Sequence, residues 1–428
     1  MTHDRPRHLP GTQAPTGTCQ TIYIVGTWDT KAREMAFLAE HIRNQGALTI
    51  TVDVGTNEPA NQSGGADIPA TVVAAHHPDG AATVFTGERG SAVTAMSAAL
   101  KPFLASRGDL AGVIGVGGSG GTALLAPGFR ALRLGVPKII VSTVASGQVG
   151  GYIDASDLVL MPSITDLAGL NRISRHVLGG AGAAITAMAR AALESARLPA
   201  DEKPALGLTM FGVTTPCVDA ISRLLADRYD CLVFHATGVG GRTMEKLVDA
   251  GMIDGVIDAT MTEVADLIVG GVMAAGADRL GAIARRRVPY VGSVGACDMV
   301  NFGSLDSVPG ALSARLFHVH NPHITLMRTT IDENVRIGAW IAERLNRCAG
   351  PVRFFLPEGG ISALDAPGMP FYDPHADSAL FDAIEQGVEP EPSRRVIRLP
   401  YHINDPAFAG AMARAFEEIR SEARHARA

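Results

Sequence analysis

Short apolar runs alternate with longer segments of helical period along the first half of the chain. The predicted strands are residues 21–26, 48–54, 111–116, 138–143 and 158–161. The predicted helices are 31–45, 91–105, 123–134 and a segment from about 166 to before Pro199. Residues 55–78 show no clear period, and we expect them to be an excursion that lines a site. Strands that alternate with helices at this spacing predict a doubly wound parallel sheet.

The same alternation restarts after a polar, proline-flanked segment at 198–204. The predicted strands are 206–211, 231–235, 352–356 and 395–399, with helices at 217–225, after Thr243, at 331–347 and at 406–423. We therefore expect an α/β fold with two Rossmann-like domains, 21–200 and 205–428. Residues 1–20 are rich in Pro, Thr and Gly and lack the apolar core of a signal peptide, so they predict a disordered tail.

Composition narrows the class of protein further. The chain is 46% hydrophobic but has no apolar stretch of transmembrane length, which excludes a helical membrane protein. The net charge of −6 offers no basic field for nucleic acid or anionic membranes, so neither is an expected partner. The five cysteines are dispersed and form no C-x-x-C motif, which favours a reducing, cytoplasmic location over a disulfide framework or a cysteine zinc site.

The stretch AGVIGVGGSGGT, residues 111–122, carries the clearest functional signal. A buried strand runs directly into a glycine turn and then into a helix, an arrangement that presents bare N–H groups to a phosphate. The pattern G-x-G-x-x-G is present, but the next strand ends in Ser142 and Thr143 instead of the acidic residue that dinucleotide sites use, and no standard P-loop occurs. We expect a phosphate site here; the alternative is a tight turn that packs a helix on a sheet.

Four stretches together resemble a known family. They are 26–31 (GTWDTK), 115–122, 142–147 (STVASG) and 162–172 (PSITDLAGLNR). In this order they are similar to the ATP-binding-domain family named after the tomato mosaic virus resistance protein, over a span from about Ile22 to the C-terminal helix. The resemblance implies two Rossmann-like domains, ATP bound mainly by the first, and self-association as a homodimer or larger homo-oligomer. In the plant protein a TIM-barrel-like region follows this module, so a separate TIM-barrel protein is an expected partner.

The expected ATP-binding residues come from these stretches and from the end of the second predicted strand. They are Gly26, Thr27, Asp29, Thr30, Lys31, Asp53, Gly117, Gly118, Ser119, Gly120, Gly121, Thr122, Ser142, Thr143, Ser146, Gly147, Asp166, Gly169, Asn171 and Arg172. Asp29 and Thr30 can instead cap the following helix. Lys31 meets a phosphate or stays solvated. Asp53 serves a ribose hydroxyl, a water bound to Mg²⁺ or a loop N–H. Arg172 contacts the nucleotide or is a surface charge.

The second half carries most of the reactive side chains. The expected catalytic residues are His235, Asp298, His318, His320 and Glu358. We expect them at strand ends that converge on a cleft facing the ATP loop, because parallel strands open on one edge. Together with His323, His318 and His320 permit a metal site. A polar strand end is the preferred interpretation of these histidines, and no metal is expected to bind them. Residues 239–241 (VGG) lie between a predicted strand and a predicted helix, a place comparable with that of residues 116–118 (VGG) in the first half.

These features support one main hypothesis and two alternatives. The main hypothesis is an enzyme that uses ATP, with Mg²⁺, on a small molecule held between the two domains, by phosphoryl transfer or carboxylate activation. One alternative is a non-catalytic, ATP-stabilised module that docks the TIM-barrel partner. The other is a metal-dependent hydrolase or lyase built on the histidines.

Overall fold

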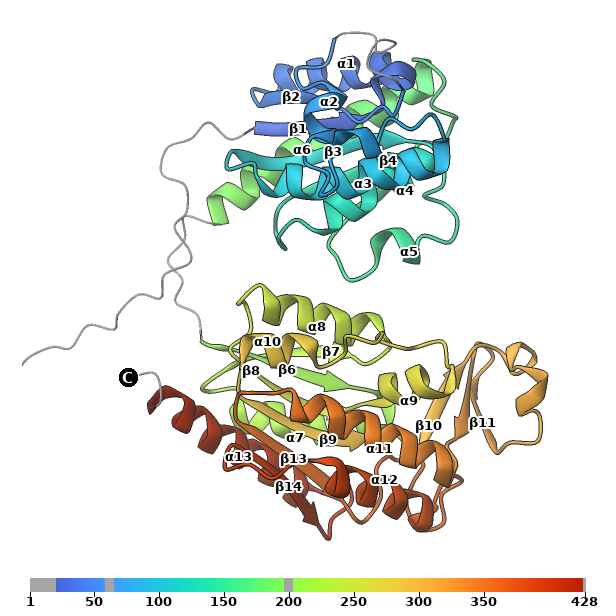
Figure 1. The fold of residues 1–428 in the computed structure, drawn as a ribbon, viewed down its shortest axis with the longest axis vertical. Helices are drawn as coiled ribbons and strands as arrows, with labels where there is room; N and C mark the ends of the chain where they lie inside the picture. Colours follow the sequence, from blue (N-terminus) through green and yellow to red (C-terminus); the bar gives the residue numbers. More distant parts are fainter. Residues whose placement is uncertain (1–20, 58–64, 196–202, 426–428) are drawn as a thin grey trace, which may run out of the picture. The chain divides into compact units, whose positions relative to one another are not determined.

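The computed structural model describes residues 21–57, 65–195 and 203–425, and the predicted tail at 1–20 lies outside them. The chain divides into two compact units, residues 1–200 and 201–428 (Figure 1). Each unit contains a parallel sheet with helices on both faces. The predicted fold class, two doubly wound parallel-sheet domains, is therefore confirmed. No helix in the described ranges is both long enough and apolar enough to cross a membrane.

The first unit is built on a five-stranded parallel sheet with the order β2-β1-β3-β4-β5. Its strands are β1 (Thr21–Gly26), β2 (Leu48–Asp53), β3 (Leu110–Gly117), β4 (Lys138–Ser142) and β5 (Val159–Pro162). Its helices are α1 (Trp28–Asn44), α2 (Ala70–Ala74), α3 (Arg89–Ala105), α4 (Ser119–Arg130), α5 (Gly150–Ile153) and α6 (Arg172–Ser195). The strand order reverses between β1 and β3, which makes this pair the switch point where such sheets bind ligands.

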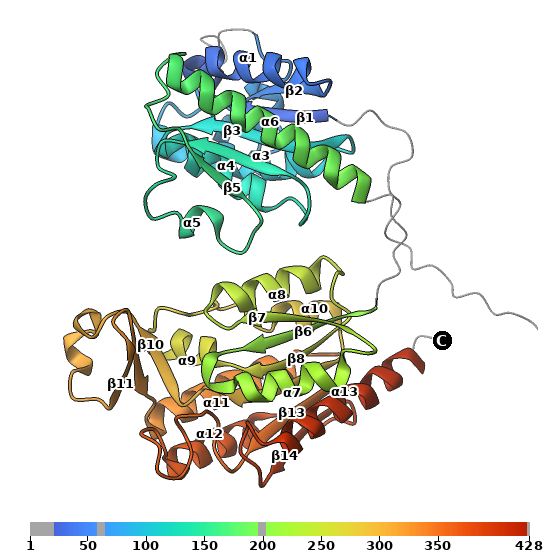
Figure 2. The same ribbon diagram turned by 180° about the vertical axis from the view of Figure 1, so that it is seen from behind.

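Helices cover both faces of this sheet, which explains why its central strands are continuous apolar runs. α1 and α6 pack on one face, and α2, α3 and α4 on the other (Figures 1 and 2). Met35, Leu38 and Ile42 form the buried stripe of α1, at the helical spacing that the sequence predicts. Gly115 lets α4 approach β3, because a Cβ there would lie 2.6 Å from Leu125 Cδ1.

In the first unit, three helices begin at least three residues away from their predicted starts. α1 begins at Trp28 and α4 at Ser119, earlier than the predicted starts at 31 and 123, because first turns rich in polar or glycine residues carry no apolar period. α6 begins at Arg172 and not near 166, because the Asn171 side chain accepts hydrogen bonds from the N–H groups of Ile173 and Ser174 at 2.8 and 2.9 Å. The short helix α2 lies in the excursion for which the sequence predicted no element.

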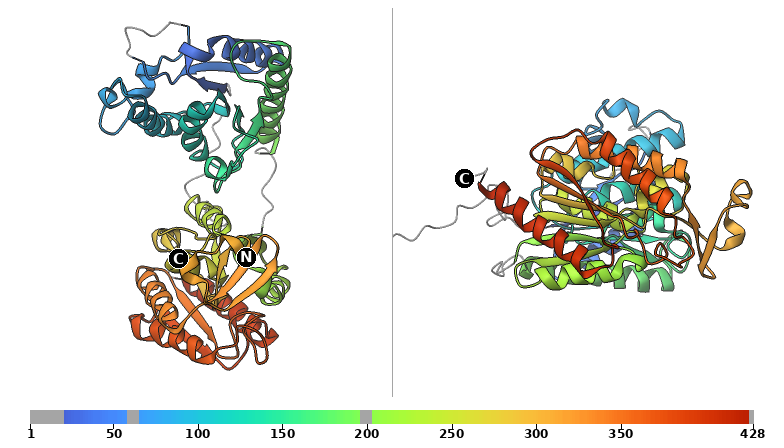
Figure 3. Two further views of the ribbon diagram at one scale, coloured as in Figure 1. Left: turned by 90° about the vertical axis from the view of Figure 1, so that its right-hand side faces the viewer. Right: turned by 90° about the horizontal axis from the view of Figure 1, so that it is seen from below.

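The second unit has a six-stranded parallel sheet with the order β14-β13-β9-β8-β6-β7. Its strands are β6 (Ala205–Met210), β7 (Asp230–His235), β8 (Gly255–Thr260), β9 (Tyr290–Gly295), β13 (Val352–Pro357) and β14 (Arg394–Leu399). Its helices are α7 (Thr215–Leu225), α8 (Val239–Asp249), α9 (Thr262–Val269), α10 (Gly281–Arg286), α11 (Ile331–Asn346), α12 (Pro374–Gly387) and α13 (Pro406–His425). α7 and α13 cover one face and the other helices the opposite face (Figure 3). Numbered within each unit, both sheets begin with the order 2-1-3-4-5.

A second, antiparallel sheet interrupts the alternation in the second unit. It has the order β10-β12-β11, formed by β10 (Met299–Phe302), β11 (Phe317–Asn321) and β12 (Ile324–Arg328). It lies at one end of this unit (Figures 1 and 2). The sequence predicts a strand at His318 and His320 but not its separation from the parallel sheet.

Candidate functional site

A cavity of about 670 Å³ opens at the carboxyl edge of the first sheet, at the switch point between β1 and β3. Four segments line it: the β1–α1 turn, the residues after β2, the start of α3 and the β3–α4 turn. The lining residues are Thr27, Asp29, Thr30, Lys31, Thr56, Asn57, Gly87, Glu88, Arg89, Ala92, Val93, Gly117, Gly118, Ser119, Gly120, Gly121 and Leu124. The structure thus brings two of the four predicted stretches together around one space.

The β3–α4 turn presents free hydrogen-bond donors to this cavity. Gly118 is the N-cap of α4, and its helix has no side-chain cap. Within the described ranges, no group accepts a hydrogen bond from the N–H groups of Gly118, Ser119, Gly120 or Gly121. These donors and the positive end of a 12-residue helix make the turn suited to an anion.

Packing requires only part of the glycine content of this turn. A Cβ at Gly117 would lie 2.9 Å from the Gly121 Cα, so the turn needs glycine there. A Cβ at Gly118 would be 3.6 Å from Thr143 Oγ1, and one at Gly120 would be 3.7 Å from an Arg89 guanidinium nitrogen. Both are ordinary contacts. Close packing of a helix on a sheet, the alternative interpretation, therefore does not account for Gly118 and Gly120.

The start of α3 adds two charged residues that the sequence analysis missed. Arg89 places its guanidinium beside Gly120, next to the free N–H groups of α4. Glu88 caps its own helix, accepting from the N–H groups of Gly90 at 2.8 Å and Ser91 at 2.6 Å. Hydrogen bonds from Ser91 and Gly90 lower the pKa of Glu88 to about 2. The N-terminus of α3 is thus already neutralised, whereas that of α4 is open; only the strand order shows that these two helix starts are neighbours.

The β1–α1 turn forms another part of the cavity wall. The hydroxyls of Thr27 and Thr30 lie 2.6 Å apart, and Asp29 accepts a 2.6 Å hydrogen bond from Asn57 Nδ2. Lys31 lines the cavity, and its ammonium donates to the Leu167 carbonyl. Lys31 is therefore not simply a solvated first-turn residue. Asp29 on this wall and Glu88 at the start of α3 are carboxylates of the kind that hold Mg²⁺, and the free N–H groups of α4 suit the phosphate that binds with it.

Two predicted residues at the first two strands have structural roles. Asp53 is buried and accepts hydrogen bonds from the N–H groups of Trp28 at 2.9 Å and Gly55 at 2.8 Å. Burial raises the pKa of Asp53 above its usual value. Of its three predicted partners, the loop N–H is therefore the one that the structure contains. Gly26 is needed for packing, because a Cβ would lie 2.7 Å from Met35 Sδ.

The other two predicted stretches do not line the cavity. The Ser142 hydroxyl is buried and lies 2.6 Å from the Thr122 hydroxyl, which fastens the start of α4 to β4. Thr143, the residue after Ser142, lies beside Gly118. Ser146 and Gly147 are exposed in the turn after β4. In the last stretch Asp166 and Arg172 are exposed, Asn171 caps α6, and the Gly169 N–H donates to Glu34 at 2.7 Å.

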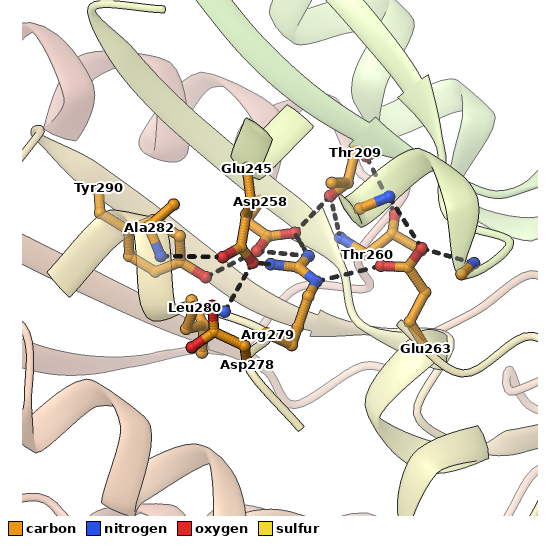
Figure 4. Close-up of polar contacts among 12 residues, drawn as sticks. Thr209, Glu245, Asp258, Thr260, Glu263, Asp278, Arg279, Leu280, Ala282 and Tyr290 are labelled. Atoms are coloured by element: carbon orange, nitrogen blue, oxygen red, sulfur yellow. Dashed lines mark hydrogen bonds and ion pairs between the residues drawn. The ribbon is translucent and has the colours of Figure 1, made fainter. Parts of the chain in front are cut away.

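The glycine turn of the second unit is not equivalent to that of the first. Residues 238–241 come after β7, the edge strand of the sheet, whereas Gly117 ends β3, a strand at the switch point. The comparison of 239–241 with 116–118 is therefore wrong, because apolar pattern does not reveal strand order. Glu263 accepts hydrogen bonds from the N–H groups of Gly238 at 2.7 Å and Gly241 at 3.0 Å (Figure 4).

The carboxylate of Glu263 belongs to a buried network around one guanidinium. Arg279 pairs with Glu245 at 3.0 Å, Asp258 at 2.8 Å and Glu263 at 3.1 Å (Figure 4). Burial alone would lower the pKa of Arg279, but the three carboxylates raise it well above its usual value. Burial raises the pKa of Glu245. This network ties α8, β8, α9 and the start of α10 together.

The predicted catalytic residues lie at several separate places in the second unit. His235, the last residue of β7, and Glu358, the residue after β13, are both exposed. Their strands are four strand spacings apart in the sheet, about 19 Å. Asp298 is fully buried, accepts from Ser362 at 2.8 Å, and has its pKa raised by burial. His318 and His320 lie on β11 of the antiparallel sheet, so the expectation that a parallel sheet aligns all five is wrong for these two.

A metal site on the histidines finds no support in the described ranges. They contain no group of three His, Cys, Asp or Glu residues placed to hold a metal ion. The His318 ring packs edge-on against Phe371, with centroids 6.3 Å apart, and the strand register shifts at His320.

Comparison with known proteins places the chain in a family. The sequence profiles of an uncharacterised protein family, UPF0261, match its N-terminal domain to residues 20–194 and its C-terminal domain to residues 203–420. The chain belongs to the UPF0261 family. The family resemblance that the four stretches predicted is thereby confirmed, while ATP binding stays a prediction.

Relatives in bacteria and plants share this two-unit chain. A UPF0261 protein of Rhizobium meliloti is 56% identical over 400 residues, covering 93% of this chain and 98% of its own length. A UPF0261 protein of Clostridium tetani is 39% identical over 401 residues, covering 92% and 97%. The ToMV resistance protein Tm-1 of tomato is 48% identical over 424 residues; the match covers 94% of this chain but only 56% of the tomato protein.

Proposed function

We propose that the first unit binds a nucleoside triphosphate, ATP with Mg²⁺, with its phosphates on the β3–α4 turn. The observation that carries this proposal is the uncapped N-terminus of α4, open to a cavity of about 670 Å³ at the switch point, with the Arg89 guanidinium beside it. Four free N–H donors and the nearby positive charge of Arg89 together form an anion site that the neighbouring helix α3 does not offer.

The two ends of the cavity suit different parts of such a ligand. Phosphate oxygens accept from the N–H groups of 118–121 and from Arg89. The carboxylates of Asp29 and Glu88 coordinate the cation, directly or through water, because Mg²⁺ is usually held by one or two carboxylates and the phosphates themselves. Ala92, Val93 and Leu124 add apolar surface to the lining. The known chemistry of such sites is phosphoryl transfer or activation of a small molecule, and this is the activity we propose.

A steric test follows from the glycine geometry. Gly118→Val fits the fold, because its Cβ has an ordinary contact and the backbone angles (φ −79°, ψ −161°) suit any residue. Its methyl groups would cover the free N–H groups, and we expect calorimetry to show at least a tenfold loss of Mg-ATP affinity. The matched control is Gly108→Val, an exposed site with open space around it. Unchanged affinity in a folded Gly118→Val protein would contradict the proposal.

Turnover separates an enzyme from a binding module. Purified protein is incubated with Mg-ATP alone and with pools of small carboxylic acids, and released ADP and phosphate are measured. Release that depends on a substrate and is lost in Gly118→Val supports the enzyme. Tight binding without release under every condition supports the alternative, a module whose nucleotide stabilises an assembly.

A further inference from the structure

The segment between β5 and α6, residues 163–171, is attached to the cavity without lining it. Two side chains from successive turns of α1 hold it: the Lys31 ammonium donates to the Leu167 carbonyl, and Glu34 accepts from the Gly169 N–H at 2.7 Å. Leu167, only 1% exposed, packs into the core beneath. These contacts fasten the middle of the segment to the helix that begins at the cavity.

The segment contains backbone strain. Ile164 has φ +66°, a value that β-branched residues rarely adopt, and the residue is 75% exposed, so packing of its side chain does not explain the conformation. Such a conformation is strained and persists only where the surroundings impose it. Neighbouring residues impose it: the Thr165 N–H donates to the Ser163 carbonyl at 2.7 Å, and the Ser163 hydroxyl donates to the Thr165 carbonyl at 2.6 Å. The contacts from α1 hold the segment further along, at Leu167 and Gly169.

Lys31 belongs to both the cavity and this segment. It lines the cavity, and its backbone (φ −127°, ψ 15°) departs from helical geometry inside α1. An ammonium has three N–H donors, and the Leu167 carbonyl takes only one of them. An anion in the cavity can therefore share the ammonium with Leu167.

We propose that Lys31 couples the cavity to segment 163–171, so that anion binding stabilises this segment in the conformation seen here. The inference rests on the proposed function, because the anion is the phosphate placed there. A bound phosphate fixes the ammonium, so that releasing Leu167 costs more free energy. By linkage, loosening the segment weakens the bound anion by the same factor. Residues of the 162–172 stretch then act on the nucleotide through Lys31 and not by contact.

Hydrogen exchange of the full chain, with and without Mg-ATP, tests the coupling. We expect Mg-ATP to slow amide exchange across 163–171 several-fold in the wild type. In Lys31→Met the nucleotide still binds the β3–α4 turn, more weakly, but exchange of 163–171 no longer changes when it is saturated. Lys101→Met, an exposed lysine on α3 outside the cavity lining, is the matched control and should behave as the wild type.

A second variant separates coupling from simple charge removal. Glu34 does not line the cavity. We expect Glu34→Gln to speed exchange of 163–171 in the free protein and to lower Mg-ATP affinity about three- to tenfold. Saturable binding with unchanged or faster exchange across 163–171 would overturn the coupling while leaving the proposed function intact. A wild type that binds neither Mg-ATP nor pyrophosphate would overturn both.

Discussion

Each unit has a glycine turn between a strand and a helix, 117–121 in the first and 238–241 in the second. In the first, packing requires Gly117 alone, and the N–H groups of 118–121 are free. In the second, a Cβ at Gly238, Gly240 or Gly241 would lie 2.7, 1.8 or 2.1 Å from the nearest atom. The Glu263 carboxylate already accepts from the N–H groups of Gly238 and Gly241.

The difference shows that one local pattern can serve two purposes. The second turn binds the Glu263 carboxylate of α9, which also pairs with Arg279, so the turn stabilises the packing of the unit. The first turn has a cavity where the second has a carboxylate. Free donors at the switch point indicate a ligand site, whereas satisfied donors on an edge strand indicate architecture.

The largest expected effect is on the second turn. Glu263→Ala leaves buried N–H groups and the Arg279 guanidinium without an acceptor, and we expect it to lower the free energy of unfolding by about 3–5 kcal/mol. The chain has two tryptophans, Trp28 and Trp340, one in each unit. Urea unfolding followed by Trp340 fluorescence in a Trp28→Phe background therefore reports the second unit. Glu343→Ala, which removes an exposed ion pair, is the control and should cost under about 0.5 kcal/mol.

Adding one methyl group to each turn sharpens the comparison. A Cβ on Gly241 would collide with Glu263, so we expect Gly241→Ala to destabilise by on the order of 2–3 kcal/mol in the same urea experiment. Gly120→Ala meets no such obstacle, and we expect it to change stability by less than about 1 kcal/mol. Equal costs at both turns would show that the first is also a packing device.

Removing charge beside the first turn should affect binding and not folding. We expect Arg89→Gln to lower Mg-ATP affinity about tenfold, because it removes one charge-assisted contact. Thermal unfolding should stay unchanged, since Arg89 is exposed. Arg133→Gln, also exposed in the first unit but outside the cavity lining, should leave affinity unaltered. An equal loss in both variants would point to general electrostatics.

The smallest expected effect concerns pH. Burial raises the pKa of Asp266 to about 7, and it raises those of Asp298 and Asp377 as well. An acid with a raised pKa in the folded state contributes stability below its unfolded pKa that is lost as pH rises through the folded value. For Asp266 this is on the order of 1 kcal/mol between pH 6 and 8. Melts followed by Trp340 should fall in midpoint over this range, and less steeply in Asp377→Asn; a rising midpoint would contradict this.

Glu88 in the first unit should respond in the opposite direction. Its lowered pKa means that its helix cap is fully formed above the unfolded pKa and is lost as pH falls toward 2. Hydrogen exchange at the start of α3 should accelerate in acid, and Glu88→Gln should remove that acceleration. Acid exchange that stays the same in both proteins would show that the cap adds no stability.

The sequence by itself determined the first parallel sheet and the first glycine turn, whereas it left β8 and β9 of the second sheet unpredicted. Runs such as 111–116 are apolar on both faces, which a strand covered by helices on both sides requires, so local pattern sufficed. The turn at 117–121 was found because glycine at a helix start is a local signal. Local pattern also sufficed for the cavity-lining residues that directly follow β1, which are Thr27, Asp29, Thr30 and Lys31.

Only the tertiary structure decided which turns meet and which donors are free. Arg89 and Glu88 reach the cavity because β1 and β3 are neighbours in the sheet, and no local pattern encodes strand order. His318 and His320 lie in a separate antiparallel sheet, which local pattern does not reveal, because it does not show which strands pair. Glu263 and Gly241 are 22 residues apart in sequence, yet their contact closes the second turn. Hydrogen bonds between distant segments depend on how whole elements pack, and the pattern of single elements does not contain that information.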